Sequence, residues 1–145
     1  MIRKIKKDNR ELETIMDIWL QATIIAHPFI EEEYWRKNYI QVKENYLPNS
    51  DTYLYIEESK VIGFISIINE EFIGALFVSP EKQRCGVGEK LINFAKQKYS
   101  KLTLAVYSEN KNAVLFYKKM GFEILQKQLN EDSHVEEFVM HIKNA

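Results

Sequence analysis

The sequence predicts one α/β domain, residues 1–145, built around a mixed sheet. Three observations predict it. The chain has 145 residues, about the length of one domain; strand-like and helix-like hydrophobic patterns alternate along it; and no linker, repeat or low-complexity stretch divides it. Hydrophobic residues make up 46% and charged residues 28%, as in ordinary folded domains. A chain of this length can bury roughly two thirds of its surface, which is enough for a core.

Each predicted element follows from its residue pattern. Runs of apolar, β-branched and aromatic residues bounded by turn residues predict seven strands, at 2–6, 53–57, 61–69, 72–78, 102–107, 122–129 and 135–142. Apolar residues at helical spacing predict four helices, at 9–26, at 31–46, after Gly88 through residues 91–99, and at 110–120. His27-Pro28 is expected to end the first helix, and Gly121 to occupy the C′ position of the last.

Composition and charge exclude several classes of protein. The formal net charge is −1 and the pI is near 6.3, whereas a nucleic-acid binder normally carries a basic excess. The single cysteine, Cys85, excludes an intramolecular disulfide and indicates a reducing compartment. No apolar run reaches the ~18 residues that a membrane span needs, and the start of the chain is too polar for a targeting signal. We therefore expect a cytoplasmic protein with no nucleic-acid or membrane partner.

Charge is unevenly distributed along the chain. Residues 1–81 carry 9 Lys or Arg against 14 Asp or Glu, residues 82–119 carry 9 against 2, and residues 120–145 carry 2 against 5. A basic middle segment could hold a polyanionic cofactor while the acidic remainder attracts a cationic substrate. Solvated lysine faces on neighbouring helices would explain the same pattern without a ligand.

A candidate phosphate-binding loop follows the strand predicted at 72–78. The sequence Gln83-Arg-Cys-Gly-Val-Gly88 leads directly into an amphipathic helix. Two glycines at a strand-to-helix junction allow backbone N–H groups to converge, and the helix dipole adds positive potential there. The loop is not a Walker motif, and Leu91 stands where a dinucleotide fingerprint needs its third glycine. A tight turn that merely requires glycines is the alternative.

A second motif begins about twenty residues later, and the two motifs together carry a family resemblance. The second motif reads Asn110-Lys-Asn-Ala113-Val-Leu-Phe116-Tyr117-Lys-Lys-Met-Gly121-Phe122. With the first it resembles the GNAT N-acetyltransferase superfamily, whose signatures are Gln/Arg-x-x-Gly-x-Gly/Ala and Asn-x-x-Ala-x-x-Phe-Tyr-x-x-x-Gly-Phe. The resemblance implies a GNAT-like, mostly antiparallel sheet of about seven strands flanked by about four helices. One parallel pair, at 72–78 and 102–107, would be splayed.

The resemblance also implies a site for acetyl-CoA as cosubstrate, with no metal. The pantetheine arm would lie between the splayed strands and bond the backbone of Leu76, Phe77 and Val78, the Leu76 amide stabilising the oxyanion. Asn110 would lie against the pantetheine, cap its helix, or both. The pyrophosphate would rest on the amides of Gln83, Arg84, Cys85, Gly86, Val87, Gly88 and Glu89.

Acetyl transfer needs a group that accepts the amine's proton and a group that donates to the departing thiolate. The resemblance implies Tyr117 as the general acid, since a phenol of pKa ~10 stays protonated at neutral pH; a core aromatic is the alternative. The base is open, because apolar Phe72 stands where some family members carry a glutamate. Glu70 and His27 are candidate bases, each with a structural alternative, and a water relay to Glu70 or Tyr107 is another route.

Two classes of function follow. The first is an acetyl-CoA-dependent N-acetyltransferase that moves the acetyl group directly to a primary amine in a ternary complex. The acidic, aromatic-rich N-terminal half favours a cationic acceptor: a protein lysine or N-terminus, a polyamine, or an aminoglycoside-like molecule. The second is a non-catalytic acyl-CoA-binding or sensory module, against which the intact Tyr117 argues. The oligomeric state is open between monomer and homodimer.

Overall fold

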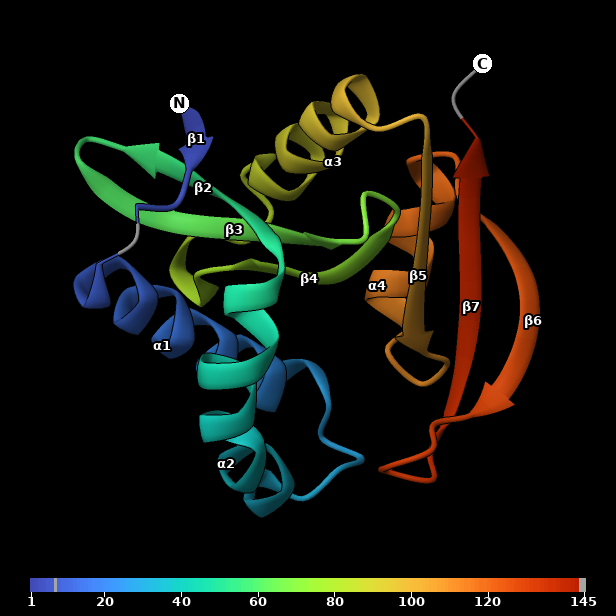
Figure 1. Ribbon diagram of the computed structural model, residues 1–145. Helices are drawn as coiled ribbons and strands as arrows, with labels where there is room; N and C mark the ends of the chain where they lie inside the picture. Colours follow the sequence, from blue (N-terminus) through green and yellow to red (C-terminus); the bar gives the residue numbers. More distant parts are fainter. Residues whose placement is uncertain (7, 144–145) are drawn as a thin grey trace.

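The computed structural model describes residues 1–6 and 8–143, and these contain seven strands in one sheet and four α-helices (Figure 1). The strands are β1 (Ile2–Lys4), β2 (Asp51–Glu57), β3 (Lys60–Ile68), β4 (Phe72–Val78), β5 (Lys101–Tyr107), β6 (Glu123–Leu129) and β7 (Glu136–Lys143). The helices are α1 (Asn9–Ala26), α2 (Glu32–Gln41), α3 (Val87–Lys98) and α4 (Lys111–Lys119). The strand order is β1-β2-β3-β4-β5-β7-β6, antiparallel except for β4 and β5, which confirms the predicted fold class.

The observed elements differ from the predicted ones at several of their ends; β2 begins at Asp51, for example, and α3 begins at Val87, before Gly88. The first strand ends at Lys4, two residues earlier than predicted. The helix predicted at 31–46 is α-helical only to Gln41, and it continues as a π-helix over Val42–Tyr46. This wider turn lies beside the sheet, where the ring of Tyr46 packs against Gly74 of β4.

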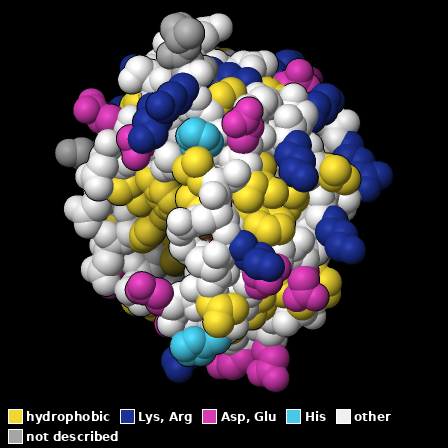
Figure 2. All heavy atoms as spheres, turned by 90° about the vertical axis from the view of Figure 1, so that its right-hand side faces the viewer, with side chains coloured by type: hydrophobic (Ala, Val, Ile, Leu, Met, Phe, Trp, Pro, Cys, Tyr) yellow, Lys and Arg dark blue, Asp and Glu magenta, His cyan; other side chains and the backbone are white. Residues whose placement is uncertain are grey.

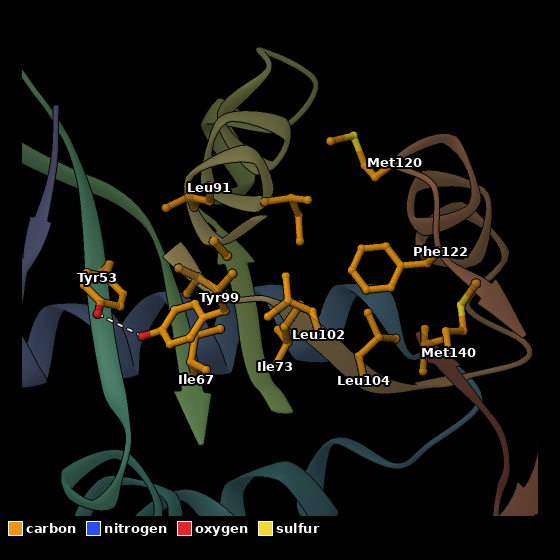
Figure 3. Close-up of a cluster of buried hydrophobic side chains, with 14 of the residues drawn as sticks. Tyr53, Ile67, Ile73, Leu91, Tyr99, Leu102, Leu104, Met120, Phe122 and Met140 are labelled. Carbon is orange, nitrogen blue, oxygen red and sulfur yellow. Dashed lines mark hydrogen bonds between the residues drawn. The ribbon is translucent and has the colours of Figure 1, made fainter. Parts of the chain in front are cut away.

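Helices cover both faces of the sheet. Neighbouring residues of a strand point to opposite faces, so Leu54 of β2 belongs to the core that contains Ile15 of α1, whereas Tyr53 belongs to the core that contains Leu91 of α3. Figure 3 shows the core that contains Leu91, in which the hydroxyls of Tyr53 and Tyr99 lie 2.9 Å apart. The core that contains Ile15 includes the aromatic side chains of α1 and α2, and these extend toward the end of β5.

β4 and β5 diverge along most of their length. In the described residues their one registered pair is Phe72 with Thr103, while β5 pairs with β7 from end to end. Ser66 lies opposite Ala75 but Ile67 lies opposite Ile73, so Gly74 is an extra residue in β4, a β-bulge. A bulge bends its strand and increases its twist, and here it carries β4 away from β5 (Figure 1). We call the region between the carboxyl halves of the two strands the splay.

The β6 edge is the most exposed part of the sheet. All seven residues of β6 are exposed, including Ile124, Leu125 and Leu129. Figure 2 shows the molecule from this side, with hydrophobic side chains lying among lysines and acidic residues. Across residues 1–6 and 8–143, none of the helices combines the length and the apolar character needed to cross a bilayer.

Candidate active site

The carboxyl half of β4 presents backbone groups to the splay. The Ser79 N–H donates to the Ile62 carbonyl at 2.8 Å, and in an antiparallel pair every second residue bonds to the same side. The N–H and C=O groups of Leu76 and Val78 therefore point away from β3, toward the splay. There the Val78 carbonyl accepts a hydrogen bond from Gln83 Nε2 at 3.2 Å. The Leu76 amide faces the region where the thioester carbonyl is expected.

The loop of residues 83–89 forms a nest of backbone N–H groups. Arg84 and Gly86 have φ of +66° and +82°, and left-handed residues in such a turn direct neighbouring N–H groups into one concavity. Residues 83–86 form a turn and a bend between the 3-10 helix Pro80–Lys82 and α3, outside the sheet and the α-helices. The N–H groups of Val87 to Glu89 belong to the first turn of α3, where no intrahelical acceptor exists. Together with the positive end of the α3 dipole, these donors make a candidate anion site.

The two sequence motifs meet at this loop. A Cβ placed on Gly88 would lie 3.4 Å from Phe116 Cζ, so the Phe116 ring of α4 rests on the first turn of α3. Val87, in the same turn, is 4% exposed and anchors the loop in the core. Cys85 is exposed, with its Sγ 3.7 Å from the Gln83 carbonyl oxygen. Val87 and Phe116 therefore hold this loop against the core, while Cys85 lies at the surface.

Tyr117 lies on α4 between two aromatic rings. Its ring centroid is 5.3 Å from that of Phe116 and 5.6 Å from that of Phe122. Burial raises the pKa of the Tyr117 phenol, so the hydroxyl stays protonated at neutral pH. Among residues 1–6 and 8–143, none forms a hydrogen bond with this hydroxyl. The phenol is therefore a proton donor that the protein itself leaves available.

His27 is the residue that ends α1, and it is almost completely buried. It is 8% exposed and lies in a box of aromatic rings, 5.0 Å from Trp35, 5.2 Å from Tyr107 and 5.6 Å from Phe29 between centroids. Burial lowers the pKa of the imidazole, against the opposing effect of a hydrogen bond with the Thr23 carbonyl oxygen. His27 is therefore neutral at pH 7.

Asn110 joins His27 to α4. As the N-cap residue of α4 it accepts a hydrogen bond from the Ala113 N–H at Oδ1, over 3.3 Å, which confirms the predicted cap. Its Nδ2 lies 3.4 Å from His27 Nε2, and its own N–H donates to the Tyr107 carbonyl at 3.0 Å. Asn110 and His27 are 83 residues apart in sequence, and the fold places them side by side at the end of β5.

Glu70 lies away from these groups. It occupies the turn between β3 and β4 with φ of +59°, next to Asn69 at +53°. This turn precedes Phe72, at the end of β4 that pairs with β5, whereas Leu76 and Val78 lie toward the other end. The neighbouring Glu71 forms an ion pair with Lys101 at 3.5 Å. The structure thus brings together His27, Asn110 and the end of β5, and it leaves Glu70 at the paired end of β4.

A hollow opens between α2 and the loop that joins β6 to β7. Its volume is about 570 Å³, and it is lined by Asn38, Gln41, Val42, Asn45, Tyr46 and Asp132. The Tyr34 hydroxyl donates to Asp132 Oδ2 at 2.5 Å, and the Tyr107 and Ser133 hydroxyls lie 2.9 Å apart. These contacts connect α2 and β5 to the β6–β7 loop beside the splay.

Sequence reasoning missed two contributors to this region, Gly74 and Asp132, and one contact of a predicted residue, Gln83. Gly74 makes the bulge that separates β4 from β5, and a glycine inside a strand pattern is a known signal of a bulge. The Gln83 side chain holds the Val78 carbonyl, a contact that no local pattern indicates. Asp132 reaches Tyr34 from a distant loop, and only the folded chain reveals this.

A strand edge that runs on into an anion-binding nest suits a long thioester that carries a diphosphate. An acyl-CoA-dependent transferase is one class of protein that needs such a site. Comparison with known proteins narrows the class. The family model described as an acetyltransferase (GNAT) domain matches residues 17–143. The chain belongs to this family and is an acetyl-CoA-dependent N-acetyltransferase, which favours the enzyme over the binding module.

Individual relatives match nearly the whole chain. Peptidyl-lysine N-acetyltransferase YiaC of Escherichia coli is 34% identical over 140 residues, 97% of this chain and 94% of YiaC. Peptidyl-lysine N-acetyltransferase YjaB of the same organism is 29% identical over 134 residues, 91% of this chain and 90% of YjaB. The solution structure of apo YjaB has a TM-score of 0.85 and covers 100% of this chain and 98% of that one. The PaiA N-acetyltransferase of Thermoplasma acidophilum, solved with coenzyme A, shares the fold at 22% identity, with a TM-score of 0.77 and 99% of both chains covered.

Proposed function

We propose that this protein, as a single domain over residues 1–145, transfers the acetyl group of acetyl-CoA directly to lysine side chains of other proteins. The structural observation that carries the proposal is the β4 edge that faces the splay and continues into the amide nest of residues 83–89. The acceptor class is supported by YiaC and YjaB, both named as peptidyl-lysine N-acetyltransferases.

The cofactor occupies the splay in this proposal. The pantetheine arm lies along β4 like an added strand and bonds the backbone of Leu76 and Val78, with Phe77 between them. The pyrophosphate accepts hydrogen bonds from the nest, and the exposed guanidinium of Arg84 reaches a further phosphate. Asn110 lies beside the pantetheine arm and directs the second hydrogen of its Nδ2 group toward it.

The chemistry then requires two donors. The Leu76 N–H donates to the thioester carbonyl oxygen, which gains negative charge as the amine nitrogen attacks the carbon; such a donor typically contributes about 100-fold or more to kcat. The nitrogen that has attacked carries a second excess proton, which passes to water. When the tetrahedral intermediate collapses, the C–S bond breaks and the sulfur of CoA takes its proton from the Tyr117 hydroxyl. Solvent then restores the phenol.

We assign the proton acceptor to His27 rather than to Glu70. At a rise of about 3.3 Å per residue, the strand from Phe72 to Leu76 spans roughly 10 Å or more, and Glu70 lies beyond Phe72 in the turn, too far from Leu76 for direct transfer. His27 lies at the end of α1 beside Tyr107, is neutral, and has an unprotonated Nε2. Burial raises the pKa of the Tyr107 phenol, so Tyr107 relays a proton through water but does not serve as the base.

The acceptor lysine approaches past acidic and aromatic side chains. Residues 1–81 carry five more acidic than basic residues, and Asp132 adds a carboxylate at the hollow beside α2. A lysine has an aliphatic stem and a cationic head, so aromatic rings such as Tyr34 and Tyr107 suit its stem while the carboxylates attract its head. The amine must lose its proton before attack, because its ordinary pKa is ~10.4.

An acceptor screen tests the proposed function. Release of free CoA is followed with acetyl-CoA and three acceptor classes: Nα-acetylated lysine peptides, polyamines and aminoglycosides. Each peptide is matched by the same peptide with arginine in place of lysine. We expect turnover on the lysine peptides and background rates on the arginine controls. Turnover confined to polyamines or aminoglycosides, or absent throughout, contradicts the assigned acceptor.

Substitution of Tyr117 by Phe tests the assigned acid. The change removes one oxygen, so we expect kcat to fall about 100-fold or more while the Kd of acetyl-CoA changes little. Tyr53→Phe is the matched control, because it removes a tyrosine hydroxyl from the core beneath α3. A Tyr117→Phe enzyme that retains full kcat would remove Tyr117 from the mechanism.

A further inference from the structure

The tautomer of His27 is set by its own helix. Nδ1 of His27 lies 2.7 Å from the Thr23 carbonyl oxygen and 3.1 Å from Thr23 Oγ1. A carbonyl oxygen can only accept a hydrogen bond, so Nδ1 carries the ring proton. The lone pair that remains is on Nε2, at the side of the ring that faces Asn110. One ring nitrogen is therefore fixed as a donor, and the other is left as the acceptor.

The orientation of the Asn110 amide is set by α4. Oδ1 accepts the N–H of Ala113 at 3.3 Å, and this contact distinguishes the oxygen of the amide from its nitrogen. The NH₂ group must then point the other way, where Nδ2 lies 3.4 Å from His27 Nε2. An N–H donor aimed at Nε2 bonds the neutral imidazole and opposes a proton at that atom. At 3.4 Å the contact is long, so an incoming amine can replace it.

No charged side chain acts on His27 within the described chain. The groups that contact it are Thr23 of α1, Phe29, Trp35 of α2, Tyr107 of β5 and Asn110 before α4. Tyr107 is the one titratable group among them, and it faces the ring edge to face at 78°. The proton affinity of His27 therefore depends on burial and on two hydrogen bonds, one that Nδ1–H donates to the Thr23 carbonyl oxygen and one that Nε2 accepts from Asn110.

We propose that Asn110 is a positioning residue for His27: through Nδ2 it holds Nε2 unprotonated and aimed at the end of β5. The inference rests on the assignment of His27 as proton acceptor in the proposed function. In the reaction, an N–H bond of the acceptor ammonium breaks and an N–H bond forms at His27 Nε2. Because Nε2 then no longer accepts a hydrogen bond, its contact with the Asn110 amide ends. The same residue begins α4, which carries Tyr117, so the amide connects the acceptor side of the site to the cofactor side.

Two substitutions separate this role from the helix cap. Asp and Ser are both good N-cap residues, so Asn110→Asp and Asn110→Ser keep an acceptor for the Ala113 N–H. In Asn110→Asp a carboxylate oxygen replaces the NH₂ group, and it accepts a hydrogen bond from a protonated Nε2 instead of donating to a bare one. The imidazolium is then stabilised, whereas Asn110→Ser leaves Nε2 without a partner.

The first measurement is NMR of ¹⁵N-labelled histidine in the protein without acceptor, which reports the tautomer and titration of His27 directly. We expect the Nδ1–H tautomer in the wild type, and in Asn110→Asp a His27 pKa raised by about one unit or more, as an adjacent carboxylate does. Asn110→Ser should show a mixture of tautomers or a smaller shift. If all three proteins give the same tautomer and titration, Asn110 does not position His27.

The second measurement is the pH dependence of kcat/KM with a lysine peptide. The acidic limb should move to higher pH in Asn110→Asp by the shift seen in NMR, while Asn110→Ser should lower kcat about tenfold. A loss that resides entirely in the Kd of acetyl-CoA would contradict the positioning role. If His27→Gln retains full kcat, the assignment of the base fails, and the NMR result still decides whether Asn110 controls His27.

Discussion

Gly74 and Gly86 both lie at the site, and each lacks a side chain for a different physical reason. At Gly74 the obstacle is another side chain, since a Cβ there would overlap Tyr46 Oη and lie 2.9 Å from Tyr46 Cε1 and from Ile68 Cδ1. At Gly86 nothing lies within 4 Å, and the obstacle is the backbone, whose φ of +82° disfavours any residue with a Cβ. Gly74 therefore allows close packing beneath the bulge, and Gly86 allows the left-handed turn that shapes the nest.

Substitution of Gly74 by Ala should destabilise the fold. Overpacking of this kind typically costs about 1–3 kcal/mol of unfolding free energy, measured by denaturant unfolding. Tyr46→Phe in the same protein removes the nearest atom, so the double variant should recover part of the loss, with a coupling of about 1 kcal/mol. Strictly additive losses would show that Tyr46 does not cause the strain.

Single residues also mark where sequence reasoning stops. Gly121, with φ of +100°, and the cap at Asn110 were predictable because each depends on neighbours within one turn. The contact between His27 and Asn110 was not, because it depends on how α1 and α4 lie relative to each other. Leu102, Leu104 and Val106 are buried as their alternation predicts.

At the scale of elements, periodicity predicted the succession of strands and helices along the chain, but not the order of the strands in the sheet or the irregularities of single elements. The π-turn at Val42–Tyr46 and the bulge at Gly74 are single-residue insertions into regular patterns, and hydrophobic spacing does not resolve them. α4 shows the same limit: Val114 and Met120 are buried, while Ala113, Phe116 and Tyr117 are only partly buried, although the spacing predicted them as core. The departure from the simple pattern coincides with the candidate site, since the Phe116 ring lies against Gly88 of the loop.

A substitution in the nest before α3 should weaken the binding of acetyl-CoA more than it weakens the stability of the fold. Gly86→Ala forces a left-handed alanine, which costs about 1 kcal/mol of stability, and relaxation of the turn withdraws the converging N–H groups. We expect the Kd of acetyl-CoA, measured by calorimetry, to rise about tenfold or more, since each lost charge-assisted hydrogen bond contributes about 1.5–3 kcal/mol. Gly88→Ala is the stability control, because its Cβ would meet Phe116 Cζ at an ordinary 3.4 Å. A Gly86→Ala protein with unchanged affinity would exclude the nest as the phosphate site.

At the scale of the whole molecule, one sheet separates two cores, and the splay lies where both cores reach the same pair of strands. The core under α3 and α4 includes Phe116 and Tyr117, while the core under α1 and α2 includes Trp35 and Tyr107. Acetyl-CoA on one side and the acceptor on the other would therefore approach a common gap from opposite faces. Ligand binding to the folded state should raise its stability, by about 2.7 kcal/mol at a ligand concentration of 100 times Kd.

The burial of His27 predicts how the stability of the whole protein depends on pH. Its pKa is lowered in the folded state, against about 6.5 in the unfolded chain, so the unfolded chain binds the proton more readily. The contribution of neutral His27 is present in full above pH ~6.5 and is lost as the pH falls toward the lowered pKa, with a slope of up to about 1.4 kcal/mol per pH unit. Urea unfolding between pH 7.5 and 5.5 should therefore show a smaller loss of stability in His27→Gln than in the wild type. His134→Asn, a change at an exposed histidine with φ of +61° that asparagine tolerates, should keep the wild-type slope. Equal slopes in wild type and His27→Gln would mean that His27 is not held neutral, and the proton acceptor would then have to be sought elsewhere.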